Sequence, residues 1–193
     1  MLDMKHVRSS RYQRPHRQRR PTVTGPQDTR FGPSPKSIAV PVPVEEAFRA
    51  YVELAMEWVP PAHRITTGTN SMTIEPWAGG RFYETAGDGA QAVRGTVLEW
   101  SPPTRLAMTW RVGPGWQVLA DDEHACHVQV DFVAQSASTT EVRVGYTHLE
   151  HCEPSFAAQL TDALSVPGPG ETLERYAQVI ARHAGGPAGA RQK

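Results

Sequence analysis

The sequence lacks the features that mark secreted, disulfide-bonded and membrane-spanning proteins. Its 193 residues include only 2 cysteines, Cys126 and Cys152, which are too few for a disulfide framework and form no CxxC pair. No stretch approaches the roughly 20 apolar residues of a membrane span, and no apolar segment follows the basic start as it would in a signal peptide. We therefore expect a cytoplasmic protein whose core needs no disulfide, since a chain of this length can bury roughly 70% of its unfolded surface.

Familiar catalytic and metal-binding motifs are also missing. The chain has no nucleophile elbow, no glycine-rich phosphate loop and no HExxH. Two HxxH spacings, His124 with His127 and His148 with His151, fall in expected strands, where residues three apart point to opposite faces and cannot chelate together. Cys126 has no basic neighbour except His124 and His127, which favours a core residue over a thiolate nucleophile. The sequence thus predicts no metal, no cofactor and no catalytic residue, and it leaves open whether the protein is an enzyme.

Charge is unevenly distributed, although the net charge is zero. Residues 1–36 hold nine of the 20 Lys and Arg residues but only two acids, so the remainder is acidic and does not by itself favour nucleic acid as a partner. Because residues 1–35 have almost no apolar periodicity, we expect a disordered basic tail there, either an arm for anionic surfaces or an extension without function. A single domain over 36–183 and a second disordered tail over 184–193 complete the expected organisation.

The apolar pattern of the domain predicts a sheet with helices on one side. A short strand at 37–42 precedes a helix from Pro43 to about Trp58, and a helical pattern after Pro154 is interrupted at Pro167–Gly170 and resumes at Leu173. Between them the period changes to two, which predicts six strands in succession at 72–76, 80–86, 92–100, 105–112, 124–133 and 140–149. We expect an α+β fold in which a curved antiparallel sheet of six to seven strands wraps around a long C-terminal helix.

Several stretches of the sequence are similar to a known family. They are 38–48 (IAVPVPVEEAF), 74–84 (IEPWAGGRFYE), 95–106 (GTVLEWSPPTRL) and Thr109-Trp110. Together they resemble the START-like or SRPBCC helix-grip domains, in the branch of the activator of heat-shock-protein-90 ATPase homologues, over residues 37–182. The resemblance implies a cavity between the sheet and the C-terminal helix, often for a lipid-like or polycyclic ligand.

The last two strands predict a polar end to this interior. If their turn centres near Ser136, Cys126 lies opposite Tyr146 and His124 opposite His148, all on the inner face with an apolar remainder. Such a face resembles a ligand pocket, whose apolar walls carry a few orienting polar groups. The alternative is that both histidines lie at hydrated strand ends.

Two glutamates offer a further candidate. Glu75 and Glu84 flank the Gly79-Gly80 turn and could act as paired carboxylates. Surface cross-strand partners of Arg81 are the commoner role for such residues, and we expect that role here.

We expect a binding protein for a hydrophobic small molecule, lipid-like or polycyclic, and either a monomer or a homodimer. The alternatives are an enzyme of the polyketide cyclase or aromatase type, with His148 or Glu84 transferring protons in the same cavity, and a co-chaperone-like module that binds proteins. The ligand-binding residues we expect are Trp58, Phe82, Val97, Met108, Trp110, His124, Cys126, Val128, Val144, Tyr146, His148 and Tyr176.

Overall fold

A computed structural model describes residues 35–114, 117–165 and 172–184, without the side chains of 159 and 161–165. The expected N-terminal tail up to residue 34, the C-terminal tail beyond residue 184 and the interruption at Pro167–Gly170 lie outside the described residues.

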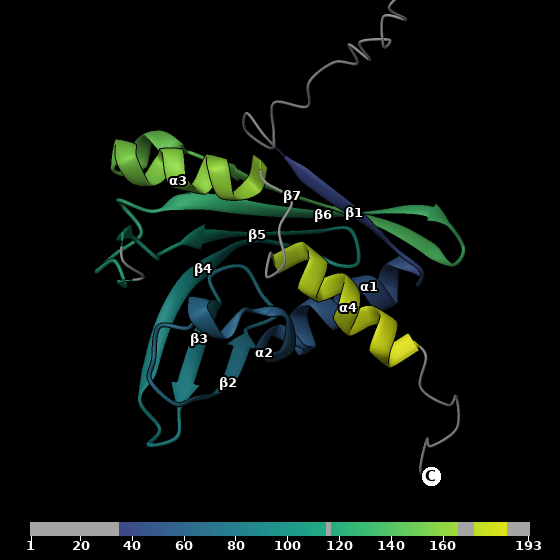
Figure 1. The fold of residues 1–193 in the computed structure, drawn as a ribbon, viewed down its shortest axis with the longest axis horizontal. Coiled ribbons are helices and arrows are strands. Elements are labelled where there is room, and N and C mark those ends of the chain that lie inside the picture. Colours follow the sequence, from purple (N-terminus) through teal and green to yellow (C-terminus); the bar gives the residue numbers. More distant parts are fainter. Residues whose placement is uncertain (1–34, 115–116, 166–171, 185–193) are drawn as a thin grey trace, which may run out of the picture.

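A single antiparallel sheet of seven strands forms the framework, in the spatial order β1-β7-β6-β5-β4-β3-β2. Six of the strands follow one another along the chain as a meander, and β1 pairs with β7 at the far edge. The sheet curls around the C-terminal helix, as Figure 1 shows, so the expected α+β helix-grip fold is confirmed. The strands are β1 (Lys36–Val40), β2 (Thr69–Ile74), β3 (Arg81–Ala86), β4 (Gln91–Ser101), β5 (Arg105–Trp110), β6 (Cys126–Ser136) and β7 (Thr139–Thr147).

Helices α1 (Val44–Glu53), α2 (Ala55–Trp58) and α4 (Thr172–Ala184) fill the concave side of the sheet (Figure 1). The expected first helix is divided at Leu54, whose φ of −105° departs from helical geometry. Two hydrogen bonds tie the layer together: Tyr176 Oη donates to the carbonyl of Ala47 at 2.7 Å, and Trp58 Nε1 donates to the carbonyl of Tyr51 at 2.8 Å. None of the helices in the described ranges is long and apolar enough to cross a membrane.

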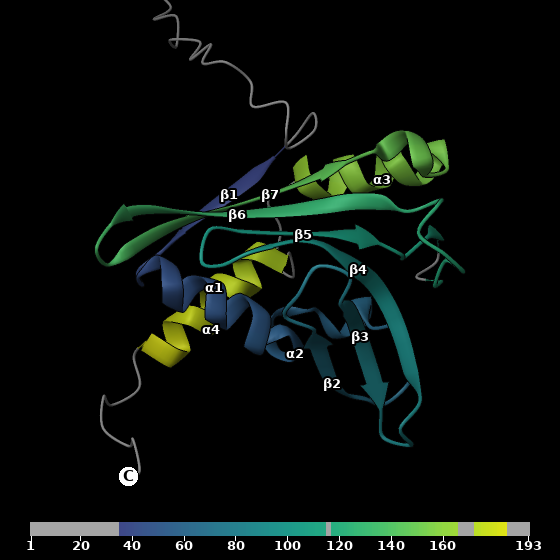
Figure 2. The ribbon, with the colours of Figure 1, turned by 180° about the vertical axis from the view of Figure 1, so that it is seen from behind.

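The interrupted C-terminal pattern corresponds to two helices on opposite faces. Helix α3 (Pro154–Ser165) follows the short 3-10 turn η4 (Leu149–His151), and Figures 1 and 2 both place it over the face of the β6–β7 pair that α4 does not cover. The helix that the sheet grips is therefore α4, which buries Leu173, Tyr176, Val179 and Ile180.

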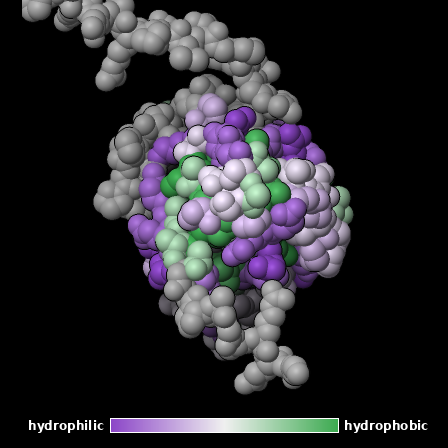
Figure 3. Space-filling model, turned by 90° about the vertical axis from the view of Figure 1, so that its right-hand side faces the viewer, coloured by the Kyte–Doolittle hydropathy of each residue, from purple (hydrophilic) through white to green (hydrophobic). Residues whose placement is uncertain are grey.

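Aromatic side chains dominate the contact between α1 and the sheet. Phe48 meets Trp100 and Phe132 edge to face, each with ring centroids 5.2 Å apart. Tyr51 stacks on Trp58 at 4.5 Å and meets Tyr176 at 5.4 Å. On the face of the molecule drawn in Figure 3, the coloured residues show hydrophobic patches between hydrophilic ones.

The predicted register of the last hairpin is wrong by two residues. Val128 lies opposite Tyr146 and Val130 opposite Val144, because the turn lies between Ser136 and Thr139 and not at Ser136, and a bulge between Ala134 and Ser136 offsets only part of that difference. A shift of two keeps every side chain on its predicted face, since side chains alternate with a period of two. The inward direction of β6 and β7 was thus predicted correctly although each partner was not.

Glycines allow close approach at two places in the sheet. In the turn before β3, Gly79 has a φ of +88° as expected, and a Cβ on Gly80 would lie 2.8 Å from Glu75 Cβ. In β4, a Cβ on Gly95 would lie only 2.0 Å from the carbonyl oxygen of Thr109 in the neighbouring strand. No side chain fits at Gly95 without moving the backbone of β4 or β5.

We predict that Gly95→Ala destabilises the protein by at least about 1–3 kcal/mol, the usual cost of overpacking. Urea denaturation should show a lower midpoint with an unchanged slope. Gly87→Ala is the matched control, because its added Cβ would have no neighbour nearer than 3.9 Å. Equal stability of the two variants would contradict the close approach of β4 to Thr109.

Candidate functional site

A fully buried ion pair lies inside the curled part of the sheet. The side chains of Glu84 in β3 and Arg94 in β4 are 0% and 1% exposed, and Nη1 of Arg94 contacts Oε1 of Glu84. Glu84 alternates in phase with Phe82 and Ala86, both buried, so it points to the inner face. Burying two charges costs free energy unless they are paired and hydrogen-bonded. The groups that surround this pair therefore decide whether it is stable.

A β-bulge turns Arg94 inward. Phe82 lies opposite Gly95 but Tyr83 lies opposite Val93, so Arg94 is the extra residue between two paired positions. A bulge of this kind re-aims one side chain and is common next to functional sites. Without it, strict alternation from Val97 would place Arg94 on the outer face.

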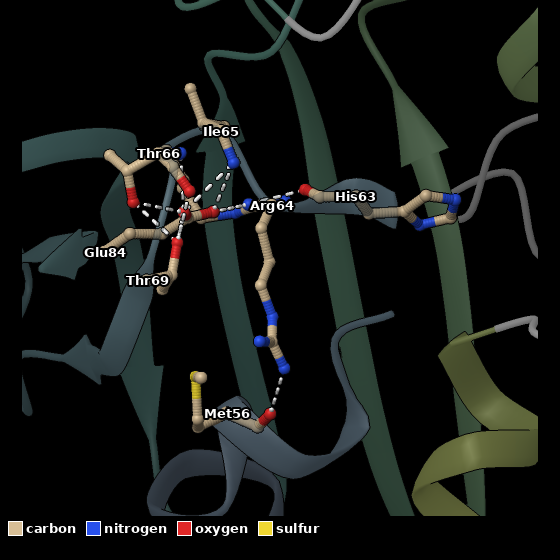
Figure 4. A network of polar contacts seen from close by, with 8 residues as sticks. Met56, His63, Arg64, Ile65, Thr66, Thr69 and Glu84 are labelled. Atoms are coloured by element: carbon tan, nitrogen blue, oxygen red, sulfur yellow. Dashed lines mark hydrogen bonds and ion pairs between the residues drawn. The ribbon is translucent and has the colours of Figure 1, made fainter. Parts of the chain in front are cut away.

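The carboxylate of Glu84 is held by the segment that leads into β2. The backbone N–H groups of Ile65 and Thr66 donate to it at 3.0 and 3.1 Å, and the hydroxyl groups of Thr66 and Thr69 donate at 3.1 and 2.8 Å (Figure 4). Burial alone would raise the pKa of Glu84, but these hydrogen bonds and the charge of Arg94 lower it overall. The carboxylate therefore stays ionised at neutral pH.

The guanidinium group of Arg94 faces aromatic rings and the preceding turn. Its Cζ lies 5.4 Å from the Phe82 ring centroid and 5.5 Å from that of Trp110, distances typical of cation–π contacts. Nη1 also donates to the carbonyl oxygen of His63 at 2.9 Å. The Nε donor of Arg94 is buried and has no hydrogen-bond partner among the described residues.

Trp110 presents a second donor without a partner. Its Nε1 is buried and unpaired within the described part of the chain, and its ring meets Tyr146 edge to face with centroids 5.7 Å apart. Both residues project to the inner face, yet both are only partly buried. The described elements therefore leave this end of the inner face partly uncovered.

His63 and Tyr146 are the ionisable neighbours of Arg94. The His63 ring points away from Glu84 across the sheet (Figure 4), and burial together with the charges of Arg94 and Arg175 lowers its pKa, so it is neutral at pH 7. Burial raises the pKa of Tyr146 well above its usual range, which keeps its hydroxyl protonated. The site thus combines a neutral imidazole, a phenol and a fixed cation.

Cys126 lies on the inner face as expected. Burial and the neighbouring Cys152 thiol raise the pKa of Cys126 far above its usual range. The thiol stays protonated, in agreement with the expectation of a core cysteine rather than a nucleophile.

The expected ligand-binding residues divide into three groups by their position in the structure. Trp110, Tyr146 and Cys126 surround the partly uncovered end. Two histidines lie elsewhere, as described below. The remaining seven are buried in the core, namely Trp58, Phe82, Val97, Met108, Val128, Val144 and Tyr176.

The expected pairing of His124 with His148 is wrong. His124 precedes β6, and its exposed side chain lies 3.5 Å from Asp121. β7 ends at Thr147, and His148 leaves the strand with a φ of +55°. Its ring lies beside His127, with centroids 4.1 Å apart. Both histidines lie outside the strands, His124 before β6 and His148 after β7, so the strand alternation that predicted an inner position does not apply to them.

Glu84 is also not the surface partner of Arg81 that the sequence predicted. Glu75 takes that role with a contact of 2.8 Å, while Glu84 is buried with Arg94. Its phase with Phe82 and Ala86 indicated the inner face. Sequence reasoning missed Arg94 and His63 altogether, because a bulge and a turn orient them.

Comparison with known protein families assigns the chain to one of them. Residues 41–160, more than half of the chain, match the sequence profile of the activator of Hsp90 ATPase homologue 1-like proteins. This chain belongs to that family. The expected START-like branch is therefore confirmed, and a comparison with curated proteins finds no match.

Solved structures agree with this assignment. One of them is an anthrahydroquino-gamma-pyrone synthase, Txn09, complexed with a compound abbreviated SUM. Its sequence is 39% identical to that of the present chain, and the two structures superpose with a TM-score of 0.54. That match covers 75% of this chain and 94% of the synthase. The self-sacrificing resistance protein CalC from Micromonospora echinospora shares the fold at 20% identity and a TM-score of 0.53, with 82% and 96% of the two chains covered. The family assignment and these structures agree with the helix-grip fold described above.

We predict that Glu84→Ala destabilises the protein by about 3–5 kcal/mol, the cost of leaving a buried charge unpaired. Glu84 should also make stability depend on pH. Because its folded pKa lies below the ordinary value of 4.5, its contribution is present above pH 4.5 and is lost as the pH falls through the folded pKa.

Urea denaturation from pH 7 to pH 3, with Glu84→Gln beside the wild type, measures this contribution. The difference between the two proteins should shrink as the pH falls below 4.5. Glu75→Ala, which removes an exposed ion pair, is the control and should change stability little. A constant difference between wild type and Glu84→Gln would contradict an ionised Glu84.

Proposed function

We propose that this protein binds a polycyclic aromatic molecule between the sheet and α4 and catalyses ring closure on it. The observation that carries the proposal is that two buried donors without partners among the described residues, Arg94 Nε and Trp110 Nε1, belong to neighbouring side chains at the partly uncovered end of the inner face. A buried donor left unpaired costs about 1–3 kcal/mol. A ligand oxygen that accepts from these groups would remove that cost.

The surrounding side chains favour a flat aromatic ligand with oxygen substituents. The rings of Phe82, Trp110 and Tyr146 and the cation of Arg94 lie close together, and such groups stack on extended π systems. The positive charge and the N–H groups favour a carbonyl or phenolate oxygen over a cationic substituent. An aliphatic lipid would leave these donors unpaired.

The name of the 39% identical relative supports the choice of reaction class. That protein is named as a gamma-pyrone synthase, and a pyrone ring contains an oxygen atom, so its formation from an open chain requires a new C–O bond. Sequence reasoning had kept a cyclase of the polyketide type as the alternative to a binding protein. The polar groups described above supply what such a reaction needs.

A ring closure can be assigned to the residues as follows. A phenol or enol hydroxyl of the substrate attacks a carbonyl carbon of the same molecule, and the neutral imidazole of His63 accepts the hydroxyl proton. The carbonyl electron pair moves to its oxygen, where Arg94 and Trp110 donate to the developing negative charge. The same imidazole then returns that proton to the oxygen, which gives a cyclic hemiketal. In a second step His63 removes a proton from the neighbouring carbon and delivers it to the hydroxyl group, so that the ring double bond forms as the C–O bond to the hydroxyl breaks and water leaves. In this proposal Glu84 holds Arg94 in place and does not react.

We predict that Trp110→Phe weakens binding of an anthraquinone-type ligand about threefold to tenfold, the value of one hydrogen bond. Because Nε1 of Trp110 has no partner among the described residues, unfolding stability should hardly change. Isothermal titration calorimetry and thermal unfolding measure the two quantities.

Trp58→Phe is the matched control. It removes an indole whose Nε1 already donates to Tyr51, so it should lower stability by about 1 kcal/mol and leave ligand affinity unchanged. The opposite pattern, with Trp58 deciding affinity and Trp110 deciding stability, would sink the proposed ligand position.

We predict that His63→Asn lowers turnover of a hydroxy-ketone polyketide at least about hundredfold, the usual contribution of a general base. The ligand dissociation constant should stay within a few-fold of the wild type. Liquid chromatography of the cyclised product and calorimetry of binding separate the two effects. Tight binding by a wild-type protein that forms no product would identify a binding protein instead of an enzyme.

A further inference from the structure

Three imidazole rings gather at the end of the β6–β7 ladder, away from the interior site. The ring centroids of His127 and His148 are 4.1 Å apart, those of His148 and His151 are 5.5 Å apart, and those of His127 and His151 are 6.3 Å apart. His148 and His151 are exposed, and His127 is half-buried. The proposed ring closure uses none of them.

The backbone brings these rings together. His127 alternates with Cys126 and Val128, which point inward, so its ring lies on the outer face. His148 follows the strand with a φ of +55°, a conformation that is uncommon for residues other than glycine. The short turn η4 then carries His151 back toward the other two rings. The expectation that His148 and His151 point to opposite faces applied to a strand, and this segment is a turn.

We propose that His127, His148 and His151 bind one Zn²⁺ ion. Imidazole nitrogen is a preferred ligand of this ion, with Zn–N bonds of about 2.1 Å, and tetrahedral geometry places the centroids of two bound rings roughly 5 Å apart. The three observed separations bracket that value. The ligand nitrogens of the three rings do not all lie within 4.8 Å of one another in this structure, so side-chain rotations must bring them together, and two of the three rings are exposed and free of the core.

Neighbouring groups prepare these rings for a cation. The His148 Nδ1 lies 3.1 Å from Thr147 Oγ1, and a hydrogen bond on one ring nitrogen leaves the other, Nε2, available to a metal. Asp122 and Glu150 add negative charge near His127. Three imidazoles leave the fourth position of the ion open for water or a carboxylate.

Titration of Zn²⁺ into the full-length protein tests the proposal. Calorimetry should give one site per chain, and His148→Asn and His127→Asn should each weaken it at least about tenfold, as loss of a metal-supporting group does. Zinc should also raise the melting temperature of the wild type but not that of His148→Asn, because an ion that binds only the folded state stabilises it. The Co²⁺-substituted protein should show the absorption bands of a tetrahedral site.

His124→Asn is the matched control. His124, Asp121 and Glu123 form another exposed group whose ligand atoms lie within 4.8 Å of one another. The proposal requires that His124→Asn leave zinc affinity unchanged. It is overturned if the wild type binds no zinc at millimolar concentration, or if zinc binding survives His148→Asn and is lost in His124→Asn. Circular dichroism of each variant verifies that it is folded.

Discussion

The buried pair of Glu84 and Arg94 is the interaction on which the arrangement of the site depends. It joins β3 to β4 and, through the hydrogen bonds of Ile65, Thr66 and Thr69, joins both strands to the segment before β2. That segment also carries His63, whose carbonyl oxygen accepts from Arg94. The backbone at His63 is therefore held by the same guanidinium group that pairs with Glu84. Removing either charge would disturb the donor and the base of the proposed reaction together.

A buried ion pair contributes little net free energy to the stability of a fold. Desolvation of two charges often exceeds their attraction, and well-packed apolar residues of the same volume can be equally stabilising. Two of the five buried polar side-chain atoms without a partner in the described residues, Arg94 Nε and Trp110 Nε1, belong to neighbouring side chains at this pair. Each such group in a folded protein calls for an explanation. A bound molecule that accepts from both donors would explain these two together.

The sequence predicted the fold much better than the site because the two depend on different features. Strand and helix positions follow from periodic apolar residues such as Leu106, Met108 and Trp110. This periodicity can be read from a single sequence. The features that the sequence missed or misplaced depend on irregularities: a bulge at Arg94, a hairpin turn after Ser136 with a bulge before it, and a left-handed residue at His148. Each of these moves a side chain to another face or to another partner. None has a periodic pattern from which it could be predicted.

Gly95 connects the regular and the irregular parts of the sheet. It follows Arg94 directly, and its missing side chain allows the carbonyl oxygen of Thr109 to approach β4 more closely than any Cβ would permit. The same stretch of β4 donates and accepts across to β5, with Thr96 N–H bonded to Thr109 Oγ1 at 2.8 Å and Arg111 N–H bonded to the Arg94 carbonyl at 2.7 Å. These contacts with the neighbouring strand hold β4 in place at the bulge. Arg94 can therefore turn inward while β4 and β5 remain paired. A glycine that looks like a weak point in a strand is, in this position, what allows a charged residue to enter the interior of the sheet.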